Sequence, residues 1–454
     1  MRSDLPVDGV PTVDPVSQRP HHRLTTLYAI DTLAPWRSFL DEQTGDCSGV
    51  AGHLRFGRLS AHYREAESQF PHVLACQEHI RCRVEGPRQD EEVKVARCRT
   101  WLFRVPHGGL VAGLTLDFDG ALRDSISLLE DAYYGETRIG EQGILDVLRA
   151  AVTSGLRPYL EDASFSTHGH QLLFVSSAGS DLVRIEDGRR ELDHDLIRRV
   201  IYRYDVPYRE DSGLIRFPAE VNRGMRSLVA CGPYFSIFVG QQDYVENSAL
   251  VAAIQLVGSS ALLSETRRHA YAALTSLRGL HTAIDETDDV DYRGVRRSLA
   301  DLSERVGRLE LDLSFGIEAY HEVAALVPSL RVSGLHRELF EAAALPDQSG
   351  SISQMLDRLS RAVAAEAASV ISAERSRDER RRLVWGVAIG FASFVAIPLT
   401  LIFSFFAVAT TDISRKTSLL DIGRYKWFYA TIGGVMLVTL CLALAAWFLT
   451  RERD

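Results

Sequence analysis

The sequence predicts an α/β domain, a long helical stalk and two C-terminal transmembrane helices within one chain of 454 residues. β-type runs alternate with helical segments up to about residue 245, and helical spacing dominates from there on. The runs 383–411 and 427–450 contain no Asp, Glu, Lys or Arg. Each run exceeds the roughly 20 residues that cross the hydrocarbon core of a bilayer. These features exclude a purely soluble enzyme.

The first 245 residues divide into a tail and a folded domain. Residues 1–24 carry Pro, Asp and Ser where an export signal needs an apolar stretch, so we expect a disordered tail that stays in the cytoplasm. Residues 25–245 are predicted to form one cytoplasmic α/β domain with a mixed sheet and a helix over 123–134. The predicted strand regions are 26–30, 72–84, 93–105, 110–119, 171–176 and 228–239.

Residues 246–382 are predicted to form a helical hairpin and a stalk. Two apolar series step by four and three residues, which is the spacing of packed or coiled helices. We expect these seams to hold an oligomer together. A break is expected at 346–350, after which one helix runs into the first span, 383–411. The seams are Val295, Leu299, Leu302, Val306, Leu309 and Leu313, followed by Ile352, Leu356, Leu359, Val363, Ala367 and Val370.

The charges beside the two spans predict their orientation. Seven basic residues lie in the flank 375–382 and the tail 451–454, against four in the loop 412–426. By the positive-inside rule we expect a multi-pass protein of the cell membrane, with both termini cytoplasmic and the loop outside. Residues 1–411 carry a net charge of about −11, which disfavours a nucleic-acid partner. The expected partners are the lipid bilayer and further copies of the chain.

Hydroxyl side chains recur along the first span at Ser393, Thr400, Ser404 and Thr411. Their spacing of seven, four and seven residues places them within about 20° of a common line along a helix. We call this set the polar stripe. It predicts a pore lining in an oligomer. The alternative is that these small hydroxyl residues mediate helix packing through hydrogen bonds to their own or a neighbouring backbone.

The layout and the local sequence Pro398-Leu399-Thr400, together with the aromatic start of the second span at 425–429, resemble the CorA family of magnesium channels. The similarity in sequence covers about the last seventy residues. It implies a pentamer in which a cytoplasmic domain controls a two-span pore. It also implies Mg²⁺ as the candidate regulator or permeant ion, and no other cofactor is expected.

The selectivity motif of that family is degenerate in this chain. Counting on from Pro398, the family's Gly-Met-Asn positions are occupied by Ala407, Val408 and Ala409. The resemblance implies that the Asn side chain and nearby carbonyls meet a hydrated divalent ion, and Ala and Val offer no side-chain oxygen. The loop that follows carries a charge of about +2. We therefore expect ion conduction with poor selectivity for Mg²⁺.

An acidic turn is expected between the two helices of the hairpin. Its carboxylates could hold Mg²⁺ or Ca²⁺, although a solvated turn explains such a run as well. His168 and His170 are interpreted as a surface pair on a strand edge. The candidate metal ligands are Asp285, Glu286, Asp288, Asp289 and Asp291.

No catalytic signature is found in the α/β region, so we do not expect an enzyme. Two other hypotheses stay open. One is a membrane-anchored sensor or effector of a bacterial stress or phage-defence type, which perturbs the membrane when its cytoplasmic domain meets a signal. The other is an enzyme that is merely tethered by its C-terminal spans.

Overall fold

The computed structural model divides the chain into two compact units. Unit 1 comprises Met1–His281 and Leu302–Arg361, and unit 2 comprises Thr282–Asp301 and Ala362–Asp454. The structure describes residues 21–32, 48–79, 84–85, 94–106, 109–134, 137–152, 157–176, 181–186, 189–203, 219–224, 227–286, 291–408, 423 and 426–451.

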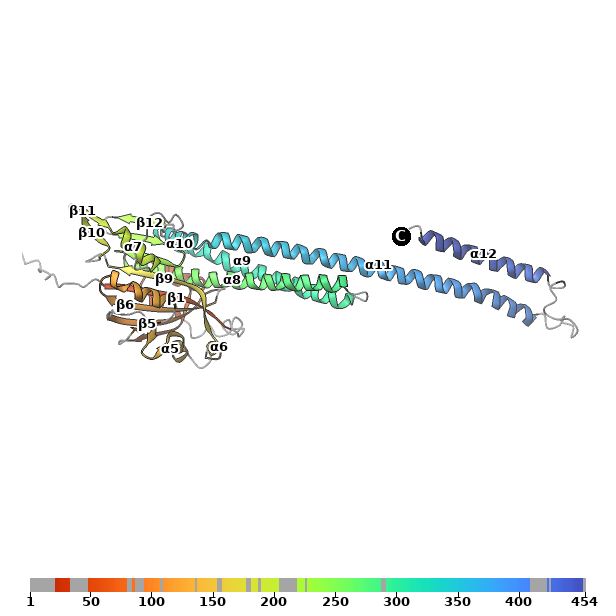
Figure 1. Cartoon of the computed structure of the whole chain (residues 1–454), viewed down its shortest axis with the longest axis horizontal. Helices are drawn as coiled ribbons and strands as arrows, with labels where there is room; N and C mark the ends of the chain where they lie inside the picture. The colour runs from red at the N-terminus through yellow and green to blue at the C-terminus, as the bar shows by residue number, and fades with distance from the viewer. Residues whose placement is uncertain are drawn as a thin grey trace, which may run out of the picture. The chain divides into compact units, whose positions relative to one another are not determined.

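Unit 1 contains a nine-stranded sheet with the order β12-β13-β14-β9-β1-β6-β5-β3-β2 (Figure 1). All neighbouring strands are antiparallel except β14 and β9, which are parallel, so the predicted mixed sheet is confirmed. The strands are β1 (His21–Asp31), β2 (Ser48–Gly49), β3 (His72–His79), β5 (Lys94–Arg104), β6 (Leu110–Asp119), β9 (Ser164–Val175), β12 (Ala219–Gly224), β13 (Ser227–Cys231) and β14 (Phe235–Val239).

Shorter elements complete the α/β region. β10 (Val183–Glu186) pairs with β11 (Arg189–Leu192), and β4 (Val84–Glu85), β7 (Arg138–Ile139) and β8 (Gln142–Gly143) form a small third sheet. The helices are α2 (Val50–His53), α3 (Ser60–Glu65), α4 (Ile126–Tyr133), α5 (Ile144–Ala151), α6 (Arg157–Leu160) and α7 (His194–Tyr202).

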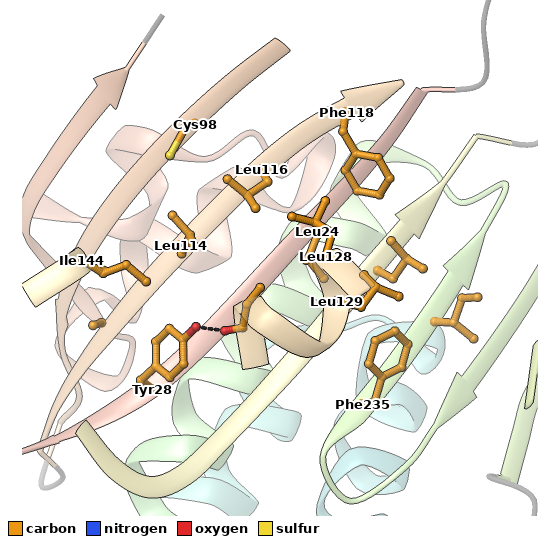
Figure 2. Close-up of a cluster of buried hydrophobic side chains, with 14 of the residues drawn as sticks. Leu24, Tyr28, Cys98, Leu114, Leu116, Phe118, Leu128, Leu129, Ile144 and Phe235 are labelled. Atoms are coloured by element: carbon orange, nitrogen blue, oxygen red, sulfur yellow. Dashed lines mark hydrogen bonds between the residues drawn. The ribbon is translucent and has the colours of Figure 1, made fainter. Parts of the chain in front are cut away.

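Both faces of the large sheet are covered. Successive strand residues point to opposite faces, so Leu173 belongs to one buried cluster and Leu172 to the other. Side chains of α4, α5 and α7 join the first cluster, which Figure 2 shows around Leu114 and Phe118. In that cluster the Tyr28 hydroxyl donates a hydrogen bond to the Ala132 carbonyl, which ties the end of α4 to β1.

The second face is covered mainly by α8 (Asp243–Glu286) and α10 (Leu330–Ala342). The stretch 249–254 of α8 is buried throughout. Gly258 makes a close approach possible, because a Cβ atom at this position would lie 2.9 Å from Val105 Cγ2. Central strands buried on both faces read as nearly continuous apolar runs, which explains why β6 was predictable from its sequence.

Several predicted boundaries are wrong in detail. β1 begins at His21, so the predicted tail 1–24 is too long, and residues 1–20 lie outside the described part. β9 begins at Ser164 and not at 171. The run 228–239 forms two antiparallel strands, β13 and β14, because Gly232 and Pro233 turn the chain between them. The helix predicted over 123–134 is present as a short 3₁₀ turn followed by α4.

The helical part consists of α8, α9 (Tyr292–Leu326), α10 and α11 (Leu345–Val408). The predicted break at 346–350 is wrong, since α11 begins at Leu345. Pro346 falls in the first turn, where its missing N–H removes no helical hydrogen bond. The predicted continuity into the apolar segment is confirmed, because α11 runs for 64 residues up to Val408.

Most residues of the two apolar seams are buried within the single chain. In unit 1 this holds for Leu302 and Val306 of α9 and for Ile352, Leu356 and Leu359 of α11. In unit 2 it holds for Leu299, Val363 and Val370. Side chains that are already covered by their own chain are not available to a second subunit. This burial argues against a second subunit at these positions, and the expectation that the seams hold an oligomer together stays a prediction.

We expect Leu302→Asp to destabilise the fold, because Leu302 is 1% exposed and a carboxylate there would lie in an apolar core. The expected loss is roughly 3 kcal/mol or more in the free energy of unfolding. Leu311→Asp is the matched control on the same helix, since Leu311 is 59% exposed. Urea denaturation of both variants measures the effect. If Leu302→Asp has normal stability but a smaller mass in detergent, the seam is an interface between subunits.

His336 of α10 gives a prediction for pH. It is 1% exposed, neither of its ring nitrogens has a hydrogen-bond partner within the described structure, and burial lowers its pKa to about 4. In the unfolded chain His336 binds a proton below about pH 6.5, whereas in the folded chain it stays neutral down to about pH 4. The free energy of unfolding therefore falls as the pH drops towards 4.

His336→Leu should therefore raise the free energy of unfolding at pH 5 by about 2 kcal/mol relative to the parent, with a smaller gain from pH 7 upwards. Denaturation midpoints at pH 5 and pH 7 measure this difference. His269→Leu, at an exposed position of α8, serves as control. A gain that is equal at both pH values would show that proton linkage at His336 is absent.

Candidate functional site

The apolar segment of α11 is exposed, whereas the apolar helices of unit 1 are buried. Two helices, α8 and α11, are long and apolar enough to cross a membrane. The apolar window of α8 is 78% buried, as in a core helix, whereas that of α11 is 6% buried. An apolar helix surface of this size needs lipid or other helices to cover it. α12 (Lys426–Arg451) adds a second apolar helix, whose described apolar stretch is Lys426–Val438.

The structure places three of the four stripe residues. Ser393, Thr400 and Ser404 lie on α11 with exposed side chains, and Thr411 lies outside the described residues. The Thr400 hydroxyl donates to the carbonyl oxygens of Ala396 at 2.9 Å and Ile397 at 2.8 Å. Such bonds satisfy a hydroxyl in an apolar medium and keep its oxygen available as an acceptor.

The polar stripe lies away from the covered side of α11. Among the described side chains of the two apolar segments, Pro398 and Ile432 are the buried ones. They belong to α11 and α12, respectively. Pro398 is about 140° around the helix from Ser393. The polar stripe is therefore exposed on a different side of α11 from the buried Pro398.

The degenerate motif falls at the end of the described helix. Val408 is the last residue of α11, and the side chains of Ala407 and Val408 lie outside the described set. Ala409 and the loop residues up to 425, apart from Gly423, lie outside it as well. The predicted role of this region stays a prediction.

The basic flank before the first span is largely exposed. Arg375, Arg380, Arg381 and Arg382 have exposed side chains. The guanidinium carbon of Arg377 lies 5.8 Å from the ring centroid of Tyr292 on α9. Arg296 of α9 and Glu374 form an ion pair at 3.8 Å. The start of α9 therefore contacts α11 about six residues before the apolar segment begins.

Within the part of the chain that the structure describes, the predicted acidic residues do not form a metal site. Asp285 and Glu286 end α8, whereas Asp288 and Asp289 lie outside the described residues. Asp291 is exposed, and its Oδ1 accepts a hydrogen bond from the Arg293 backbone N–H at 3.2 Å. No group of three or more His, Cys, Asp and Glu side chains in the described part is arranged to hold a metal ion. The predicted divalent site stays a prediction.

The interpretation of His168 and His170 as a surface pair is wrong. β9 lies between β14 and β1 and is not an edge strand, and His170 is fully buried. Its Nε2 lies 3.0 Å from the Ser236 Oγ and its Nδ1 lies 3.3 Å from the Pro233 carbonyl oxygen. Burial lowers the pKa of His170 to about 4, so it is neutral at physiological pH.

A polar cavity of about 380 Å³ lies in unit 1 where β9 and β14 end and α8 begins. Arg23 and Glu246 form an ion pair there, and the Arg23 guanidinium carbon lies 4.8 Å from the Phe174 ring centroid. Burial raises the pKa of Glu246, and Arg23 opposes this shift. Arg23, Phe174 and Asp117 meet because β1 is paired with both β9 and β6. Sequence reasoning missed this set, since only the strand register brings it together.

Comparison with known proteins gives a weak similarity in structure and none in sequence family. No protein-family model matches the chain, and no curated protein matches it. Among solved structures the chain is similar to the full-length CmaX protein, with 12% identity and a TM-score of 0.29 over 63% of this chain and 89% of that chain. A similarity at this level assigns neither a family nor a function, so membership of the CorA family stays a prediction.

Proposed function

We propose that the protein is an oligomeric, CorA-like membrane channel in which α11 lines the pore and the N-terminal domain controls passage. The observation that carries the proposal is the exposure of Ser393, Thr400 and Ser404 on the side of α11 away from Pro398. Hydroxyl groups that are aligned along an apolar helix and exposed on it offer a path of oxygen atoms to water or ions.

One stripe on one helix cannot enclose an aqueous path. Copies of the chain arranged around a rotation axis would each contribute a stripe, so the function requires a ring of subunits. A pentamer is the ring that the resemblance implies. Most side chains of the apolar seams are buried within their own chain, so we expect the contacts between subunits at other surfaces. The exposed apolar segment of α11 is one such surface.

The charges at both ends of the path argue against a magnesium channel. The apolar segment contains no carboxylate from 383 to 408, the inner flank is basic, and the loop is basic overall. Hydrated Mg²⁺ gives up its waters reluctantly and is held by carboxylates or other oxygen ligands. Monovalent or weakly selective conduction is the expected behaviour. Mg²⁺ would then act, if at all, at the acidic turn 285–291.

We predict that both termini are cytoplasmic, because the arginine-rich flank outweighs the loop in positive charge. Alkaline phosphatase fused after residue 454 should be inactive, since the enzyme needs the oxidising exterior. The same enzyme inserted in the loop 412–426 is the control and should be active. Activity of the C-terminal fusion would reverse the topology.

Single cysteines at Ser393, Thr400 and Ser404 should react with water-soluble thiol reagents if the polar stripe faces water. The background must lack the exposed Cys76 and Cys441 as well as Cys47 and Cys82. Leu399→Cys is the matched control, because Leu399 is exposed in one chain but lies about 120° from the stripe. Equal labelling at all four positions would contradict the pore lining.

Flux through liposomes containing the purified protein tests conduction itself. We expect K⁺ or Cl⁻ flux that exceeds Mg²⁺ flux and that falls when Ser404 is replaced by Leu, because an apolar side chain narrows and dewets the path. Mg²⁺-selective flux would contradict the proposed loss of selectivity. Absence of any flux, with labelling restricted to the stripe, would favour the membrane-anchored sensor or effector.

A further inference from the structure

Arg203 is a half-buried cation that follows helix α7 in unit 1. Its backbone adopts the left-handed conformation with φ 53°, a conformation that L side chains rarely adopt and that Gly or Asn usually supplies after a helix. Sparsely populated backbone conformations of this kind cluster at functional sites. The position is thus unusual in both its backbone and its charge.

The groups that contact Arg203 are neutral. Its guanidinium carbon lies 3.7 Å from the ring centroid of Tyr133, which places the cation over the aromatic face. Its Nη1 donates a hydrogen bond to the Gln171 Oε1 at 3.0 Å. Gln171 is itself fixed, since its Nε2 donates to Thr26 Oγ1 at 3.0 Å and to the Leu129 carbonyl at 2.8 Å. Within the described part of the chain no carboxylate lies within 4.0 Å of Arg203.

A buried arginine is normally paired with a carboxylate, because burying a charge is costly unless it is paired and hydrogen-bonded. Burial lowers the pKa of Arg203, and the neighbouring Tyr133, Tyr134 and Glu130 act in the opposite direction. Contact with an aromatic face stabilises a cation by about 0.5–2 kcal/mol, which offsets only part of the cost of burying its charge. Glu130 acts on Arg203 but, within the described residues, forms no ion pair with it, and the remaining guanidinium N–H groups are suited to a bound anion.

Two tyrosines in this region are open to solvent. Tyr134 is 65% exposed and its ring lies 5.3 Å from that of Tyr133 in an edge-on arrangement. Tyr234 is 55% exposed, and its carbonyl accepts a hydrogen bond from the Gln171 backbone N–H at 2.9 Å. Tyr133 contacts Arg203, and Tyr134 and Tyr234, which are both open to solvent, act electrostatically on Tyr133.

We propose that Arg203, with Tyr133, Tyr134 and Tyr234, forms a binding site for a compact oxyanion, either a phosphate or a carboxylate group of a small ligand. The planar guanidinium can present two parallel N–H groups to such an anion, and tyrosine hydroxyls can add further donors. This site does not depend on the proposed channel function. A purely structural Arg203 would only fasten the end of α4 to the sheet through Tyr133 and Gln171.

Calorimetric titration of the full chain in detergent with inorganic phosphate and, separately, with succinate tests the site. We expect saturable binding of at least one anion, and the better of the two identifies the chemical source. Arg203→Lys keeps the positive charge but loses the two parallel N–H donors of the guanidinium group, so it should weaken anion binding at least ~10-fold. Tyr234→Phe should weaken it severalfold, and Arg198→Gln on the same helix should leave it unchanged.

Thermal unfolding with and without the anion separates binding from a structural role. The anion should raise the unfolding temperature of the parent and of Arg198→Gln, but not that of Arg203→Lys. Two results would overturn the proposal. One is the absence of saturable binding of either anion to the folded parent chain. The other is unchanged binding by Arg203→Lys, which would leave Arg203 with the structural role alone.

Discussion

The continuous α-helical course of α11 is the constraint on which the proposed mechanism depends. An α-helix satisfies its interior peptide groups internally, so it can pass from a protein core into an apolar medium without a change of conformation. α11 uses this property over 64 residues, about 96 Å, with one apolar face buried at Leu356 and Leu359 and nearly all sides exposed beyond Leu383. Pro398 interrupts the hydrogen-bond pattern within that exposed segment.

The sequence predicted those features that depend on composition and local periodicity. The strands β5 and β6, the helix α4 and the charge-free segment of α11 were found because apolar spacing reports burial directly. The same spacing led us to expect a subunit interface at the seams, although Leu302 and Ile352 are buried by their own chain. A heptad pattern specifies that a face is covered, and it does not specify which chain covers it.

The polar groups inside the domain could not be predicted, because strand register and long-range packing bring them together. Gln171 meets Thr26 through the pairing of β9 with β1, and it meets Arg203 only after α7 has packed on the sheet. His170 looked like a surface residue until β9 was placed at the centre of the sheet. Of the candidate pore residues, the alignment of Ser393, Thr400 and Ser404 was predictable, whereas the uncovered side of α11 required the structure.

The apolar character of α8 has a consequence for biosynthesis. Its central window is hydrophobic enough for a translocon to accept as a transmembrane segment, yet in the folded protein it is 78% buried in unit 1. Chain order resolves this conflict, since all nine strands of the large sheet precede α8 and emerge from the ribosome before it. The sheet face that takes up α8 is thus complete when α8 emerges, and prompt docking would divert the helix from the membrane. α11 emerges later, and its C-terminal apolar segment is not covered by the sheet.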